Sequence, residues 1–139
     1  MKVRDIMTKN VAYINPAQTV AEAAKMMQQH NVGSIPVCDQ NGLVGIVTDR
    51  DIVIRNIANG GNPQNTAVRD VMTSNVTSVT PEMDVNQISH IMARQQVRRM
   101  PVVENNKLVG IVALGDMATD HRFDTEASEA LTEISKPVK

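Results

Sequence analysis

The feature that most constrains this chain is an internal duplication. Sliding the 139-residue sequence by 65 residues aligns 3–52 with 68–117 without a gap, and 20 of the 50 aligned positions are identical. Unrelated sequences of this composition agree at roughly 3 of 50 positions. The chain is therefore expected to fold as two copies of one small unit. A single copy cannot bury both faces of its sheet, so the copies are expected to pack together with pseudo-two-fold symmetry.

Each copy predicts the same order of elements, β-α-β-β-α. A short strand precedes a proline, a capped helix follows, and an Asn-containing turn joins two further strands before a second helix. In copy one, we expect a short strand near 12–14, a helix capped by Thr19, strands through 36–37 and at 43–47 joined by a turn at 39–42, and a second helix starting near Asp49. In copy two, we expect a short strand near 77–79, a helix capped by Asp84, strands at 101–103 and 108–112 joined by a turn at 104–107, and a second helix starting near Leu114.

Apolar residues at helical spacing predict one buried stripe on the first helix of each copy. The stripe holds Val20, Ala23, Ala24 and Met27 in copy one and Val85, Ile88 and Met92 in copy two. The fold class is thus α/β in the broad sense (α+β).

The repeats set the expected domain boundaries. We expect repeat 1 at 1–58, a linker rich in turn formers at 59–66, repeat 2 at 67–120 and a C-terminal tail at 121–139. Within the tail, 124–135 can form a helix, although isolated helices this short are marginal and its order stays open. Its expected caps are Asp124 or Thr125, its apolar side holds Ala127, Leu131 and Ile134, and its acidic side holds Glu126, Glu129 and Glu133.

Composition excludes several classes of protein. The net charge is −1, which argues against a nucleic-acid-binding surface, and the single cysteine rules out an intrachain disulfide framework. No apolar run approaches the roughly 20 residues of a membrane helix, and no apolar segment of a signal peptide follows Met1. We therefore expect a cytoplasmic protein without a membrane segment. Aromatic residues are nearly absent, so a flat ligand would be held mainly by aliphatic side chains.

Three repeated motifs resemble the cystathionine β-synthase-type (CBS) domain family. They are Val-Arg-Asp-Ile-Met-Thr at 3–8, Ile-Pro-Val at 35–37 and Gly-Ile-Val-Thr-Asp-Arg-Asp at 45–51, which returns as Gly-Ile-Val-Ala-Leu-Gly-Asp at 110–116. The resemblance covers residues 1 to 120. It implies a stand-alone CBS pair that dimerises through its faces, binds AMP, ADP, ATP or another adenosyl ligand in clefts between the repeats, and regulates an unknown partner protein.

The Thr48-x-x-Asp51 pattern at a strand-to-helix turn has two interpretations. A carboxylate there can accept both ribose hydroxyls, while the threonine hydroxyl holds a phosphate. The same spacing is also that of a capping box, which only starts a helix. The family resemblance favours ligand binding, and both roles are compatible. In the second copy Ala113 replaces the threonine and Asp116 remains, which puts phosphate binding at that cleft in doubt.

Arginine side chains distinguish the two predicted clefts. Arg98 and Arg99 precede the second-copy proline, where the first copy has Gly33 and Ser34. A guanidinium group suits phosphate, although an exposed basic pair on a loop is the alternative. By family resemblance, cleft 1 comprises Ile46, Thr48, Asp51, Val76, Thr77, Arg98, Arg99, Met100 and Pro101. Cleft 2, expected to bind phosphorylated nucleotides more weakly, comprises Ala12, Gly33, Ser34, Ile35, Pro36, Ile111, Ala113 and Asp116.

No other motif predicts chemistry. His30, His90 and His121 lack metal-ligand spacing, and Cys38 is expected to be a buried thiol. The clefts offer no activated nucleophile or acid–base pair, so we expect neither an enzyme nor a required cofactor or metal. The competing hypothesis is a ligand-independent dimerisation and protein-interaction module.

Overall fold

The computed structural model describes residues 1–118 and 124–136. The chain forms two compact units. The repeat-1 unit is Ala12–Val76, and the repeat-2 unit combines Met1–Val11 with Thr77–Lys139. The sequence repeats begin at residues 3 and 68, so the leading segment of each repeat belongs to the unit that contains the body of the other. Within the described residues, no helix is both long and apolar enough to cross a membrane.

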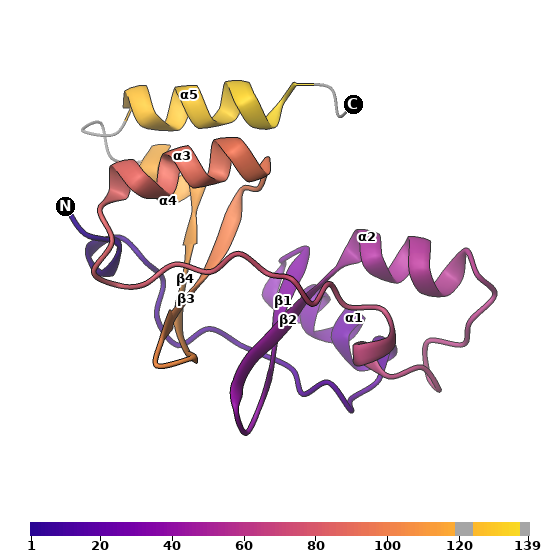
Figure 1. Cartoon of the computed structure of the whole chain (residues 1–139). Helices are drawn as coiled ribbons and strands as arrows, with labels where there is room; N and C mark the ends of the chain where they lie inside the picture. The colour runs from indigo at the N-terminus through magenta and orange to yellow at the C-terminus, as the bar shows by residue number, and fades with distance from the viewer. Residues whose placement is uncertain (119–123, 137–139) are drawn as a thin grey trace. The chain divides into compact units, whose positions relative to one another are not determined.

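From the first long helix of each repeat onward, the elements follow the predicted order (Figure 1). The short leading strands are reduced to single parallel bridges, Ile14 with Val37 and Val79 with Val102. The repeat-1 unit contains α1 (Val20–His30), the antiparallel strands β1 (Ser34–Asp39) and β2 (Gly42–Thr48), α2 (Asp49–Asp51) continued by the π-helix η2 (Ile52–Ile57), and the 3₁₀-helix η3 (Val68–Asp70). The repeat-2 unit contains the 3₁₀-helix η1 (Val3–Asp5), α3 (Val85–Gln95), the antiparallel strands β3 (Arg99–Glu104) and β4 (Lys107–Ala113), α4 (Leu114–Ala118) and α5 (Asp124–Ile134).

The first helix of each unit begins at the predicted cap. Thr19 Oγ1 accepts a hydrogen bond from the Glu22 amide at 3.2 Å, and Asp84 forms a capping box with Gln87. These bonds satisfy amide groups that a helix start leaves without a partner.

The predicted apolar stripes are buried, with one exception. Ala24 is exposed, so its predicted burial is wrong. Its counterpart Ser89 is buried on α3, which packs against α5. The repeat-1 unit has no helix corresponding to α5, and this is the physical reason that Ala24 stays at the surface.

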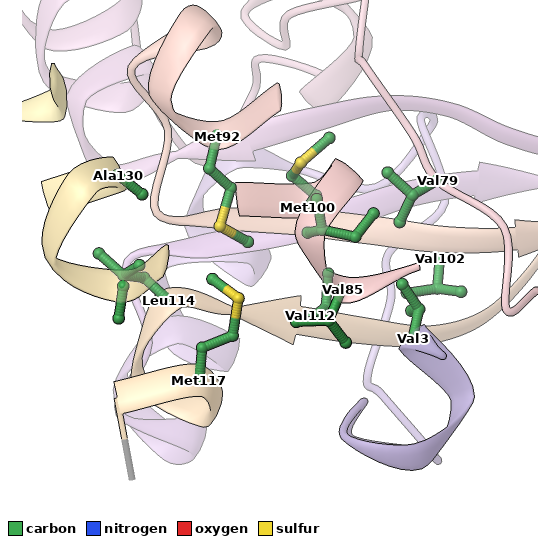
Figure 2. Packing of buried hydrophobic residues seen from close by; sticks show 12 residues of the cluster. Val3, Val79, Val85, Met92, Met100, Val102, Val112, Leu114, Met117 and Ala130 are labelled. Carbon is green, nitrogen blue, oxygen red and sulfur yellow. The ribbon is translucent and has the colours of Figure 1, made fainter. Parts of the chain in front are cut away.

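Each unit is built around its own hydrophobic core. Figure 2 shows the repeat-2 core, in which Val3 from the leading segment joins Val102 and Val112 from the hairpin. In the repeat-1 core, Val68 and Val71 play the same part, and both are at most 1% exposed. Full burial of such a side chain stabilises a fold by about 1.5–3 kcal/mol. The leading segments are therefore structural parts of the units that receive them.

A glycine in each hairpin lets the leading segment pass close to the strand. A Cβ on Gly45 would lie 2.8 Å from the Thr73 carbonyl oxygen, and a Cβ on Gly110 would lie 2.8 Å from that of Thr8. Next to Gly45, Ile46 and Thr73 exchange two backbone hydrogen bonds of 2.9 and 2.8 Å. The repeated Gly-Ile-Val motif thus has a packing reason.

The tail forms the expected helix, α5, and part of its apolar side packs against the core. Ala127 and Ala130 are buried in the repeat-2 core and Ile134 packs against it, whereas Leu131, on the expected apolar side, is 44% exposed. Small alanine side chains allow α5 to lie close along α3 (Figure 1). The helix already begins at Asp124, and the residue before it lies outside the described residues. The side chains of Asp124, Thr125 and Glu126 lie outside the described part as well.

Candidate functional site

The Thr48-x-x-Asp51 pattern is a capping box in the structure. Thr48 Oγ1 accepts from the Asp51 amide at 3.0 Å, and the Thr48 amide donates to Asp51 Oδ2 at 3.0 Å. Asp51 is 8% exposed. The capping interpretation is therefore confirmed, and it leaves the second carboxylate oxygen, Oδ1, outside the box.

Two residues that the sequence analysis missed surround this carboxylate. Thr73 Oγ1 lies 3.5 Å from both carboxylate oxygens, at the outer limit of a hydrogen bond. Arg55 Nε lies 3.8 Å from Oδ1. A carboxylate has about four acceptor positions, so these long contacts leave Oδ1 able to accept from a further donor. The missed signals were the threonine that ends both copies of the Val-Arg-Asp-x-Met-Thr motif and the i, i+4 spacing of Asp51 and Arg55.

Arg55 also binds the leading segment of repeat 2. Its Nη1 donates to the carbonyl oxygens of Val71 at 3.2 Å and Met72 at 3.0 Å. One guanidinium group thus contacts the Asp51 carboxylate and the main chain that carries Thr73. Its planar arrangement of donors allows these contacts at the same time.

The repeat-2 counterpart is only half of a capping box. The Ala113 amide donates to Asp116 Oδ2 at 2.9 Å, but alanine has no hydroxyl to accept the reciprocal bond. Asp116 is half-buried. The replacement of threonine by Ala113 thus leaves the repeat-2 turn with one capping bond where the repeat-1 turn has two.

The segments before the two prolines differ in charge and in surroundings. Arg98 and Arg99 are exposed. At the corresponding place in repeat 1, the Asp49 amide donates to the Gly33 carbonyl at 2.9 Å, and Asp49 Oδ2 would lie 3.1 Å from a Cβ on Gly33. A carboxylate thus lies against the predicted cleft-2 residue whose cleft-1 counterpart is an arginine. Sequence spacing alone did not indicate Asp49.

Besides Asp51, four predicted ligand residues are buried. Ile35 and Met100 are 2% and 1% exposed and belong to the two cores. Pro36 and Pro101 are also buried. The side chains of Ile35 and Met100 therefore contribute to the packing of their units.

Each predicted cleft takes residues from both units. For cleft 1, Ile46, Thr48, Asp51 and Val76 lie in the repeat-1 unit, and Thr77, Arg98, Arg99, Met100 and Pro101 lie in the repeat-2 unit. For cleft 2, Ala12, Gly33, Ser34, Ile35 and Pro36 lie in the repeat-1 unit, and Ile111, Ala113 and Asp116 lie in the repeat-2 unit. Thr48 and Asp51 are brought together within one unit, as are Ala113 and Asp116. The convergence of the halves from different units stays a prediction.

Other reactive side chains form no alternative site in the described part of the chain. Cys38 is buried; burial raises the pKa of its thiol, and Asp39 adds to this rise. Among residues 1–118 and 124–136, no group of three or more His, Cys, Asp or Glu side chains can hold a metal ion. His121 lies outside the described residues. A groove of about 340 Å³ along α3 and α5 is lined by none of the predicted ligand residues.

Comparison with known proteins identifies both repeats. The sequence pattern of the CBS domain matches residues 3–56 and 68–119. The CBS domain-containing protein YhcV of Bacillus subtilis is 49% identical over 133 residues, which cover 96% of this chain and 94% of YhcV.

Two solved structures show the same fold. The CBS domain pair of protein MJ0100, in complex with 5′-methylthioadenosine and S-adenosyl-L-methionine, has a TM-score of 0.75 at 28% identity over 86% of this chain and 94% of that one. A hexameric CBS-CP12 protein from bloom-forming cyanobacteria has a TM-score of 0.76 at 31% identity over 90% of this chain and 73% of that one. The predicted α+β fold of a CBS pair is thereby confirmed.

Proposed function

Because the chain belongs to the CBS domain family, we propose that it is a regulatory module that binds an adenine nucleotide (AMP, ADP or ATP) or another adenosyl ligand between its two repeats. The solved MJ0100 pair binds two adenosyl compounds, which supports this class of ligand. In this proposal the chain catalyses no reaction, and a partner protein responds to the ligand-bound state.

The observation that carries the proposal is the arrangement of Asp51. Its Oδ2 is held by the Thr48 amide at 3.0 Å, whereas Oδ1 has only long contacts. A carboxylate held in this way accepts the two hydroxyls of a ribose. The Thr48 hydroxyl accepts from the Asp51 amide and keeps its own proton to donate to a phosphate.

Charge supports a ranking of the two clefts. In the proposed cleft 1, Arg98 and Arg99 contribute the cations that a phosphorylated nucleotide requires. In cleft 2 the corresponding place has Gly33 with the Asp49 carboxylate beside it, and the threonine is replaced by Ala113. We propose that cleft 1 binds the phosphorylated nucleotide and that cleft 2 discriminates against phosphate.

The test is isothermal titration of AMP, ADP, ATP and S-adenosyl-L-methionine with the unaltered chain and with Asp51→Asn. Asparagine can still accept from the Thr48 amide, so the helix start is kept while the charge is removed. Because hydrogen bonds to charged groups contribute about 1.5–3 kcal/mol, we expect Asp51→Asn to weaken nucleotide binding by about 10- to 100-fold. Ligand binding should also raise the melting temperature of the unaltered chain by mass action.

Asp116→Asn is the matched control, because it removes the same charge from the other repeat. A larger loss of ATP affinity from Asp116→Asn than from Asp51→Asn would overturn the ranking of the clefts. If no adenosyl compound binds at millimolar concentration, the proposed ligand class is wrong.

A second candidate function, ligand-independent dimerisation, is favoured by the surface of η2. Val53, Ile54 and Ile57 are 54%, 50% and 52% exposed on this one helix. The corresponding positions of repeat 2 are Ala118, Thr119 and Arg122, so the apolar set belongs to repeat 1 alone. Clustered exposed apolar side chains mark interaction surfaces, and the same patch on two copies is self-complementary. We propose that a second copy of this chain covers it.

A further inference from the structure

Asp51 has a neighbour that links it to a distant part of the sequence. Arg55 Nε lies 3.8 Å from Asp51 Oδ1, and Arg55 Nη1 donates to the Val71 and Met72 carbonyl oxygens at 3.2 and 3.0 Å. The side chain of Arg55 is 50% exposed, whereas that of Asp51 is 11% exposed. The guanidinium group therefore lies at the surface, between the carboxylate and residues 71–73.

Residues 71–73 are held to β2 by further contacts around the same carboxylate. Thr73 and Ile46 exchange backbone hydrogen bonds of 2.8 and 2.9 Å, and the Thr73 hydroxyl lies 3.5 Å from both Asp51 oxygens. Gly45 makes this close approach possible. Asp51, Arg55 and Thr73 thus form one network that joins α2 and η2 to the start of repeat 2.

The long contacts in this network are the ones that a ligand can change. A donor on Oδ1 would share the carboxylate with Thr73 and Arg55, because a carboxylate has about four acceptor positions, and it leaves the short bond from the Thr48 amide to Oδ2 undisturbed. A change in the position of the guanidinium group also changes its bonds to the Val71 and Met72 carbonyls. Binding at Asp51 and the order of residues 71–73 are then coupled, and this coupling is reciprocal.

This arrangement exists in one repeat only. The residue that corresponds to Arg55 in repeat 2 is Asp120, which carries a negative charge instead of donors and lies outside the described residues. Thr8 corresponds to Thr73 and pairs with Ile111 by backbone hydrogen bonds of 2.8 and 2.9 Å. The difference between the repeats is therefore the arginine and not the backbone pairing.

We propose that Arg55 is a positioning residue that orients the Asp51 carboxylate for the ligand and transmits ligand occupancy to residues 71–73. This inference rests on the proposed function, because it assumes that Asp51 binds the adenosyl ligand. It adds the route by which the bound state reaches the leading segment of repeat 2, a segment buried through Val68 and Val71.

The test is hydrogen–deuterium exchange of the amides of residues 71–73, with and without whichever of AMP, ADP and ATP gives the largest thermal shift. In the unaltered chain, saturating nucleotide should slow exchange of these amides by about fivefold or more. In Arg55→Met, affinity should fall by about tenfold, a size typical of coupled sites, and the exchange response at saturation should be lost.

Two further variants separate positioning from simple stability. Arg50→Met removes the same charge from the exposed side chain of Arg50, five residues earlier, and should keep both affinity and exchange response. Arg55→Lys keeps the charge but not the planar set of donors, so affinity should recover in part while the response of 71–73 stays reduced. If Arg55→Met does not fold, the comparison of Arg55→Lys with the unaltered chain decides.

The outcomes also separate this inference from the proposed function. If nucleotide binds and Arg55→Met shows the same exchange response as the unaltered chain, the role of Arg55 is refuted and the proposed function stands. If no adenosyl compound binds the unaltered chain, the proposed function fails and this inference fails with it.

Discussion

The two oxygens of the Asp51 carboxylate have different surroundings. Oδ2 accepts the capping bond from Thr48, and Oδ1 faces the long contacts from Thr73 and Arg55. A capping role and a binding role are often treated as alternatives. Here they involve different oxygens of one side chain, so the cap can hold the carboxylate in place while the other oxygen accepts from a ligand.

A change at Ala113 tests the cap at the residue scale. The Ala113 amide already donates to Asp116 Oδ2 at 2.9 Å, so Ala113→Thr supplies the missing hydroxyl of a complete box. We expect the free energy of unfolding to rise by about 1 kcal/mol, because that is the typical contribution of a threonine cap. Urea denaturation measures the change.

The matched control for this variant is Thr48→Ala, which removes the hydroxyl from the complete box and should destabilise the chain by a similar amount. If Ala113→Thr lowers stability while Thr48→Ala behaves as expected, the repeat-2 turn does not have the geometry of a capping box.

At the scale of elements, the exchanged leading segments explain the most repeated part of the sequence. Val3 and Val68 are fully buried in the units that receive them, and Gly110 and Gly45 give room for the passing backbone. The leading Val-Arg-Asp motif and the Gly-Ile-Val motif thus form one contact with each other, and this contact occurs once in each unit. The Gly-Ile-Val motif resembles a ligand signature in sequence, yet its glycine is required by packing.

The close approach at Gly45 predicts the result of adding a methyl group. In Gly45→Ala the new Cβ would lie 2.8 Å from the Thr73 carbonyl oxygen and 2.9 Å from Met72 Sδ. The backbone oxygen cannot move without breaking the pairing of Thr73 with Ile46. We expect a loss of about 1–3 kcal/mol in the free energy of unfolding, as is typical of overpacking. Thermal or urea denaturation measures it.

Gly115→Ala is the control for this prediction. Nothing lies within 4 Å of a Cβ at Gly115, which is in α4, and alanine favours a helix over glycine by about 0.8–1.0 kcal/mol. This variant should therefore be more stable than the unaltered chain. Equal stability of the two variants would contradict the role given to the close approach.

At the scale of the whole molecule, the duplication has produced two units with different surfaces. The repeat-2 unit is covered by α5, which buries Ala127 and Ala130. The repeat-1 unit has no counterpart of α5 and instead presents Val53, Ile54 and Ile57 on η2. The two repeats share a fold but offer different sites for association.

We expect this apolar surface of η2 to form the contact between two copies of the chain. The unaltered protein should have twice its chain mass of 15.2 kDa in light scattering coupled to size exclusion. Ile54→Asp places a charge in the centre of the contact and should shift the protein to the monomer, because an unpaired buried charge is strongly unfavourable.

Leu131→Asp is the matched control, since Leu131 is 44% exposed on α5 and lies outside the proposed contact. It should leave the dimer intact. A monomeric unaltered chain, or a dimer that Ile54→Asp does not affect, would contradict the proposed surface.

The sequence by itself determined the duplication, the element order and the capping residues. These features depend on local rules: periodicity, turn residues and the bonds that a helix start requires. For this reason Thr19, Asp84 and the Thr48–Asp51 pair were predictable. The repeat-to-repeat differences at Ala113, Arg98 and Arg99 could also be read directly from the alignment of the two copies.

Only the tertiary structure decided which segments pack together. Three features depend on which surfaces meet. They are the exchange of the leading segments, the contact of Arg55 with the Val71 and Met72 carbonyls, and the burial of Ala130 while Leu131 stays exposed. Ala24 stays exposed for the same reason, since its helix has the apolar spacing but no helix covers it. Local spacing specifies a face of an element, and burial of that face requires a neighbour that lies far away in the sequence.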